Sequence, residues 1–342
     1  MNVLYKNKWV NPDALLDSSA FITVAIGARG IGKTYGCLKE LYMRKIPFLY
    51  CRRTQAQLDE TTSKSLNPYN RIAEDIGVNI VTDRIGKHSV GFYDAVMENG
   101  KAIRAENPFA IGIALSTFST IRGMSAETFD VLLFDEIIPE RHERKIQNEG
   151  IAFLNMLESL NRNRELTGRK PIHVILLSNS NTINSQILDS IGCLREIDKM
   201  ARSGKERSII KNGLIEIIIY KDSPISEEKA KTALYQVSNN ENFSDMALSN
   251  KFSCSDYELV RNRPLQEYYP IVSYGNCTVY RHKSKTEYYC IDGVKAEKRF
   301  EKLPLSKINF SREFGFLYSA LIKGKVNYSS VTAKIELEGA FE

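Results

Sequence analysis

Residues 21–36 read FITVAIGARGIGKTYG, and this stretch decides the fold. From Gly27 to Thr34 it matches every fixed position of the pattern Gly-x-x-x-x-Gly-Lys-Ser/Thr. An apolar strand-like run precedes the match and a helix-like run follows it, so the glycines can fold the backbone into a nest of N–H groups around phosphate oxygens. A glycine-rich turn without a ligand is the alternative, and the complete match in this context disfavours it. The sequence therefore predicts a P-loop.

The P-loop side chains have separate expected roles. Lys33 is expected to reach the β- and γ-phosphates of ATP, and the Thr34 hydroxyl is expected to bind Mg²⁺. Arg29 is either a phosphate contact or a solvated loop residue, and the fit of a guanidinium to phosphate favours the contact. The residues expected to hold the nucleotide are Gly27, Ala28, Arg29, Gly30, Ile31, Gly32, Lys33 and Thr34.

Short apolar runs alternate with amphipathic stretches over the first 200 or so residues, the pattern of a parallel sheet covered by helices. The expected strands are residues 21–26, 48–51, 111–115, 131–134 and 173–177. Between the second and third of these, alternating segments around the turn Asn99-Gly100 predict an antiparallel insertion.

Two carboxylates follow the apolar run Val131–Phe134, at the edge of the sheet where ligands bind in open α/β folds. Asp135 is expected in the magnesium shell, and Glu136 is placed to orient and deprotonate a water that attacks the γ-phosphate. An acidic solvated turn is the alternative, which the preceding P-loop disfavours. The second carboxylate favours ATP hydrolysis over transfer of phosphate to a small molecule.

Other polar residues lie where expected strands or helices end. Asn179 follows the strand at 173–177 and could bind the γ-phosphate or the attacking water, or cap an Asx turn. Arg52 and Arg53 follow the second strand, as nucleotide contacts, DNA contacts or ion-pair partners. Residues 120–123 form either a phosphate-facing loop or a surface turn.

The segment Asn161 to Glu165 reads NRNRE and follows a helix-like run. An arginine close to a nucleotide site often serves an adjacent subunit, where it neutralises charge on the transferred phosphoryl group. A basic helix end that complements the helix dipole is the alternative, and the residues alone favour it.

The composition limits the class of protein. The chain has 342 residues, 43% hydrophobic and 26% charged, with a net charge of +6, which suits a soluble two-domain protein able to meet a polyanion. Its 6 cysteines include no C-x-x-C pair and its 4 histidines are scattered, so neither a disulfide framework nor a zinc site is indicated. The N-terminus has no apolar signal segment, and we expect the protein in the cytoplasm, with no membrane contact.

The residue composition and the hydrophobic pattern change along the chain. We expect a nucleotide-binding domain over residues 1–197, a linker or lid subdomain over 198–255, and a smaller domain over 256–342. Within these, Ser226 is the expected N-cap of a helix, and the last domain carries strand-like runs rich in Tyr, Lys and Arg. That interleaving could track a DNA backbone, but a half-exposed sheet is the favoured interpretation.

In this order and spacing, the segments FITVAIGARGIGKTYG, FLYCRR, VLLFDE, LNRNRE and ILLSN resemble the DNA-packaging motor ATPases of small short-tailed bacteriophages, compact relatives of large terminase subunits. The resemblance implies an α/β P-loop NTPase fold of the additional-strand catalytic-glutamate type. It also implies a ring of about five identical subunits that pumps double-stranded DNA into a preformed capsid at its portal vertex. Such a protein works in the host cytoplasm and leaves the finished virion.

Carried onto this chain, the resemblance places the catalytic glutamate at Glu136, the magnesium aspartate at Asp135 and the trans-acting arginine finger at Arg162, with Arg164 as the second choice. It makes the C-terminal domain a small α+β relative of RNase H-like nucleases. Ser273 and Tyr274 stand where an acidic metal ligand is expected, so we expect a vestigial domain that grips DNA or portal without cutting. The N-terminal adenine motif departs from the family pattern, because Asp13 stands where a glutamine is usual.

Three other functions stay open from the sequence. They are a DNA pump of another type, a nucleotide-dependent assembly switch without motor activity, and an active C-terminal nuclease. The use of a packaging RNA between motor and portal stays open as well.

Overall fold

The computed structural model describes residues 3–63, 65–121, 127–139, 143, 146–180, 182–221, 223–237, 257–293 and 306–341. The chain divides into two compact units: one of residues 1–181, 185–193 and 200–251, the other of residues 182–184, 194–199 and 252–342. Among the described residues, no helix combines the length and the apolar character needed to cross a bilayer. The five described cysteines are buried and free.

A mixed sheet of ten strands forms the centre of the first unit, in the order β11-β12-β3-β10-β9-β4-β8-β6-β5, with β7 paired to β6. The six strands from β12 to β8 are parallel, and those outside them pair antiparallel. The strands are β3 (Ile22–Gly27), β4 (Phe48–Arg52), β5 (Asn79–Gly86), β6 (Ser89–Glu98), β7 (Lys101–Arg104), β8 (Ala110–Ala114), β9 (Val131–Phe134), β10 (His173–Asn179), β11 (Arg207–Ile210) and β12 (Ile215–Ile219).

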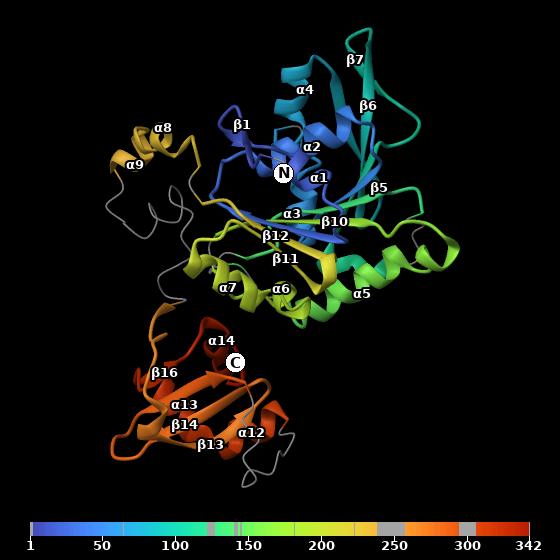
Figure 1. Ribbon diagram of the computed structural model, residues 1–342. Helices are drawn as coiled ribbons and strands as arrows, with labels where there is room; N and C mark the ends of the chain where they lie inside the picture. Colours follow the sequence, from blue (N-terminus) through green and yellow to red (C-terminus); the bar gives the residue numbers. More distant parts are fainter. Residues whose placement is uncertain are drawn as a thin grey trace. The chain divides into compact units, whose positions relative to one another are not determined.

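Figure 1 shows helices on both faces of this sheet, with α5 and α6 on one side and α1, α2 and α4 on the other. Every residue of β3, β9 and β12 is buried, which explains their continuous apolar sequences. A hairpin of β1 (Tyr5–Lys6) and β2 (Trp9–Val10) comes first in this unit. Its helices are α1 (Asp13–Leu16), α2 (Lys33–Met43), α3 (Gln55–Glu60), α4 (Asn70–Ile76), α5 (Glu149–Asn161), α6 (Gln186–Ser190), α8 (Ser226–Ala230) and α9 (Ala233–Val237). Of α7 (Leu194–Ser203), residues 194–199 are assigned to the second unit and the rest to the first.

The strand order explains how the site is assembled. β10 lies between β3 and β9, so one strand separates the P-loop strand from the strand that ends at the two carboxylates. The expected strands and the antiparallel insertion are confirmed, the insertion as β5, β6 and β7. Because the central strands are parallel, their C-terminal ends meet at one edge, where the P-loop, Asp135, Glu136 and Asn179 all follow a strand.

The expected separate subdomain from residue 198 needs correction. β12 pairs in parallel with β3, from Ile215 opposite Ile22 to Ile219 opposite Ile26, and β11 pairs with β12. The apolar run was recognisable as a strand, but its burial on both faces beside β3 makes it part of the nucleotide-binding sheet. Ser226 opens α8 as its first residue, and Ile225 occupies the N-cap. The expected polar turn at residues 239–245 lies outside the described residues.

The second unit is built around a sheet in the order β13-β14-β15-β16. The first three strands are antiparallel and β16 joins β15 in parallel, around a core that includes Cys277, Val279, Phe310 and Leu337. Its elements are β13 (Tyr268–Tyr274), β14 (Cys277–His282), β15 (Tyr288–Asp292), α12 (Lys307–Glu313), α13 (Gly315–Ile322), β16 (Val326–Tyr328) and α14 (Val331–Gly339). Its relation to RNase H-like nucleases stays a prediction.

A partly buried polar contact between the neighbouring strands β3 and β10 makes stability depend on pH. The His173 ring lies 3.0 Å from the Thr23 hydroxyl, and burial lowers the pKa of His173 to about 4, against the opposing effect of Glu216. The unfolded chain, with a pKa of 6.5 at this residue, binds more protons between these two values. His173 should therefore contribute a fall of about 3 kcal/mol to the free energy of unfolding as the pH drops from 7 to 4.

Urea unfolding of the wild type and of His173→Gln at pH 7 and pH 4.5 tests this expectation. The glutamine can keep a hydrogen bond to Thr23 but carries no titrating group, so its pH dependence should be shallower. Equal pH dependence in the two proteins would contradict the assignment to His173.

Candidate nucleotide-binding and catalytic site

The P-loop runs from the end of β3 into α2, which begins at Lys33. Gly30 and Gly32 have φ angles of 66° and 90°, in the left-handed region that favours glycine. A Cβ at Gly32 would lie 3.3 Å from the indole of Trp9, so the loop also packs against the β1–β2 hairpin. The helix starts at the loop with no side-chain cap, which leaves its N-terminal N–H groups directed at the loop.

Lys33 is buried at the centre of this loop. Its Nζ donates to the carbonyl oxygens of Gly27 at 3.0 Å and Ala28 at 2.7 Å, and to Asn179 Oδ1 at 3.3 Å. Burial lowers the pKa of Lys33 to about 7, an effect opposed by Asp135 and Glu136. The structure thus brings Asn179 to the P-loop lysine, as expected for the end of the strand beside β3.

Thr34 and Asp135 form the part of the site that could hold a cation. The Thr34 hydroxyl donates to Asp135 Oδ1 at 2.9 Å, and Tyr50 Oη donates to Asp135 Oδ2 at 3.2 Å. Burial raises the pKa of Asp135, while Arg52 lowers it. A hydroxyl and a carboxylate are the hard oxygen ligands that Mg²⁺ takes beside phosphate oxygens and waters, so this pair fits the ion.

Glu136 has an unusual backbone and a guanidinium partner. Its φ of 57° is in the left-handed region, which is rare outside glycine and is found at functional sites. Arg52 Nη2 donates to Glu136 Oε2 at 2.6 Å and Arg52 Nη1 donates to Asp135 Oδ2 at 3.1 Å. Of the roles left open for Arg52, the structure shows the ion pair, and its position between the two carboxylates was not foreseen.

Arg162 lies at the opposite edge of the sheet from its own P-loop. α5 starts at Glu149, whose carboxylate contacts Arg53 just beyond the end of β4. It ends at Asn161, whose side chain accepts from the N–H of Ile172 just before β10 begins. The helix is about 20 Å long. Arg162 is exposed at its C-cap and donates from Nε to Ser159 O at 3.1 Å, so it is presented away from its own site.

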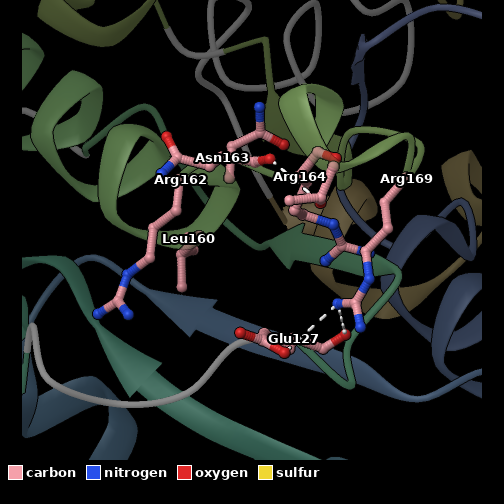
Figure 2. Close-up of a pocket in the computed structure, with 8 residues that line it drawn as sticks. Glu127, Leu160, Arg162, Asn163, Arg164 and Arg169 are labelled. Atoms are coloured by element: carbon pink, nitrogen blue, oxygen red, sulfur yellow. Dashed lines mark hydrogen bonds and ion pairs between the residues drawn. The ribbon is translucent and has the colours of Figure 1, made fainter.

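Figure 2 shows how the arginines of this loop differ. They line a hollow of about 440 Å³ together with Asn161, Asn163 and Glu127. Arg169 pairs with Glu127 at 3.6 Å, whereas the Arg162 side chain points to another side of the hollow. Arg162 is therefore exposed to solvent at this hollow.

Arg164 does not fit the role of second-choice finger. It is buried, and its Nη1 donates to Phe129 O at 2.6 Å and its Nε to Lys170 O at 3.1 Å. Nη2 lies 3.3 Å from Asp130 Oδ1. These contacts fasten the loop to the residues before β9, so the side chain is used within its own subunit.

Comparison with known sequences places this architecture in a family. The podovirus DNA encapsidation protein (Gp16) family matches residues 4–290. The chain belongs to this family. It is 25% identical over 254 residues to a DNA packaging protein of Bacillus phage phi29, covering 72% of this chain and 67% of that protein. It is 24% identical over 265 residues to a DNA packaging protein of Bacillus phage PZA, covering 75% and 70%.

Two solved structures share the fold of this chain. The bacteriophage Phi-29 viral genome packaging motor assembly is 18% identical, with a TM-score of 0.64 over 98% of this chain and 100% of that one. The Phi-28 gp11 DNA packaging motor is 17% identical, with a TM-score of 0.58 over 98% and 97%. The shared fold includes both units of the chain.

Arg53 points away from the site and stabilises the first unit through ion pairs. Its side chain is fully buried, with Nε donating to Glu149 at 2.7 Å and Nη1 to Glu143 at 2.7 Å. Removing one partner of a buried ion pair leaves an uncompensated charge, which typically costs about 3 kcal/mol or more. We expect Arg53→Met to lower the free energy of unfolding by about this amount in urea titrations.

The double variant Arg53→Met, Glu149→Gln is the matched control, because it also removes the more buried of the two carboxylates that lose their partner in the single variant. It should be more stable than Arg53→Met alone. A loss below about 1 kcal/mol in the single variant would contradict the ion-pair account.

The expected loop at residues 120–123 is described only at its first two residues. Arg122 and Gly123 lie outside the described residues, so the role of that loop stays a prediction.

Near the N-terminus, Asn11 Nδ2 donates to Val3 O at 2.8 Å and Asn11 Oδ1 accepts from the N–H of Asp13 at 3.2 Å. Asn11 thus holds the turn after the hairpin, and Asp13 pairs with Arg44 at 2.6 Å.

Proposed function

We propose that this protein hydrolyses ATP at the P-loop and uses the reaction to drive double-stranded viral DNA into a preformed capsid. One observation carries the proposal. Lys33, the Thr34–Asp135 pair and Glu136 meet at one edge of the sheet. A triphosphate bound there would face the carboxylate of Glu136, which can act as a general base. Membership of a DNA encapsidation family and the packaging relatives support the link to DNA.

The chain's own residues divide the work of hydrolysis. The P-loop N–H groups and Lys33 bind the phosphates, and Thr34 and Asp135 would hold Mg²⁺, which neutralises phosphate charge. Glu136, with a side chain that is 45% exposed, is placed to accept a proton from the attacking water. Arg52 fixes where this carboxylate lies, and Asn179 is close enough to the lysine to contact the γ-phosphate or the water.

The position of Arg162 supports a site shared between subunits. Because α5 carries it to the edge where the strands begin, it cannot serve the P-loop of its own chain. In a head-to-tail ring, each subunit would present this edge to the nucleotide of its neighbour. Arg162 would then neutralise charge on the transferred phosphoryl group, and Arg164 would hold the loop that carries it.

The DNA and portal contacts belong to the same proposal. The net charge of +6 suits a polyanionic partner, and the relatives are named for DNA packaging. We place the protein in the host cytoplasm and transiently at the portal vertex of the capsid, as a ring of identical subunits. The smaller C-terminal unit is the candidate for contact with DNA or portal.

Steady-state ATP hydrolysis with and without double-stranded DNA, across a salt series, tests the proposal. We expect DNA to stimulate turnover and added salt to weaken the stimulation, because phosphate contacts release counterions. Turnover that ignores DNA at every salt concentration would contradict the coupling. Nucleotide binding without turnover would instead support an assembly switch.

A further inference from the structure

The short helix α8 lies against the P-loop, although nearly 200 residues separate them in sequence. β12 runs parallel to β3, so the chain leaves the sheet at the same edge, where the N–H of Tyr220 donates to Ile26 O at 2.8 Å. Lys229 of α8 then donates from Nζ to the carbonyl of Arg29 at 2.5 Å. A Cβ on Gly30 would lie 3.7 Å from the same ammonium, which places Lys229 over the middle of the loop.

A second contact holds α8 in this place. Glu228 pairs with Lys8 in the β1–β2 hairpin, the same hairpin whose Trp9 packs on Gly32. The hairpin and α8 therefore both touch the loop and contact each other. Lys229 is also 5.8 Å from the ring centre of Tyr235 in α9, which links the ammonium to the second short helix.

Three positively charged side chains belong to this loop or contact it: Lys33, Arg29 and Lys229. Lys229 and Arg29 are both close enough to Lys33 for the like charges to repel one another. Burial lowers the pKa of Lys229. Asp135 and Glu136 are engaged with Arg52, and Glu228 with Lys8. A polyphosphate in the loop would relieve this repulsion.

We propose that Lys229 is a further nucleotide-binding residue, contacting the terminal phosphates of ATP from α8 in the same subunit. The proposal rests on the nucleotide site proposed above and adds a cation that the P-loop pattern does not contain. It makes α8 and α9 the part of the chain that responds to the number of phosphates, because the ammonium can bind either the Arg29 carbonyl or a phosphate oxygen. This cation differs from Arg162, which comes from the neighbouring subunit.

Nucleotide affinity of the full chain tests the proposal. Trp9 is the only tryptophan and lies beside Gly32, so it can excite fluorescent mant-labelled AMP, ADP and a non-hydrolysable ATP analogue in the presence of Mg²⁺. Lys229→Ala should weaken binding of the ATP analogue by about tenfold or more, the effect of a lost charge-assisted hydrogen bond. Binding of AMP should change by less than about twofold, because AMP lacks the terminal phosphates.

Lys231→Ala is the matched control, because Lys231 is an exposed lysine directly after α8. It should bind all three nucleotides like the wild type. Lys229→Ala binding the ATP analogue as the wild type does, or losing AMP and ATP affinity equally, would overturn the inference. Failure of the wild type to bind any nucleotide would instead overturn the proposed function, so the two failures are distinguishable.

Discussion

Glu136→Gln is expected to abolish ATP hydrolysis and to leave ATP binding intact. The amide has the shape of the carboxylate and its oxygen can still accept from Arg52 Nη2, which now lies 2.6 Å from Glu136 Oε2. It cannot take a proton from the attacking water, so turnover should fall by about a hundredfold or more. Phosphate release under single-turnover conditions measures the chemistry, and mant-nucleotide fluorescence measures binding.

Glu158→Gln is the matched control for Glu136→Gln. Glu158 is exposed on α5 and lies one turn before Arg162, far from the P-loop edge of the sheet. It should hydrolyse ATP at the wild-type rate. Unchanged hydrolysis in Glu136→Gln would remove the catalytic role of this carboxylate and favour a nucleotide-dependent switch.

Arg162→Ala is expected to lower ATP turnover by about a thousandfold in the assembled protein, the lower end of the range for arginine fingers. Nucleotide binding and the free energy of unfolding should stay near the wild-type values, because the side chain is exposed at the end of α5. Steady-state hydrolysis and urea unfolding of the same preparations measure both quantities.

Two further arginines of the same hollow show whether the effect belongs to Arg162. Arg169→Ala removes an exposed charge paired with Glu127 and should leave turnover unchanged. Arg164→Ala should lose stability, because its buried guanidinium holds the carbonyls of Phe129 and Lys170. Equal losses of turnover in Arg162→Ala and Arg169→Ala would show a general charge effect and contradict the finger.

Much of the site could be predicted because its residues lie at strand ends. The P-loop pattern identifies Lys33 and Thr34 by spacing, and an apolar run before Asp135 and Glu136 places both at the same edge. The contacts Thr34–Asp135 and Lys33–Asn179 then follow from parallel strands that end together. Local pattern and sheet geometry sufficed for these residues.

The rest depended on pairings between residues far apart in sequence. No local pattern distinguishes Arg52, which contacts Asp135 and Glu136, from Arg53, which is buried against Glu149. The same holds for Arg164, whose guanidinium is buried against the carbonyls of Phe129, before β9, and Lys170, before β10. β12 was recognisable as a strand, but only its register with β3 shows that it brings α8 to the P-loop.

Mixing experiments with two variants test the shared active site most directly. Arg162→Ala keeps Glu136, and Glu136→Gln keeps Arg162, so a mixed ring contains interfaces with both residues intact. Two results support the account: the two inactive variants regain ATP hydrolysis when mixed, or small fractions of either variant inhibit the wild type beyond simple dilution. Regained hydrolysis indicates shared sites that work independently. Inhibition beyond dilution indicates shared sites that hydrolyse ATP in a coordinated order. If the variants stay inactive together and each merely dilutes the wild type, every subunit works alone and the account is wrong.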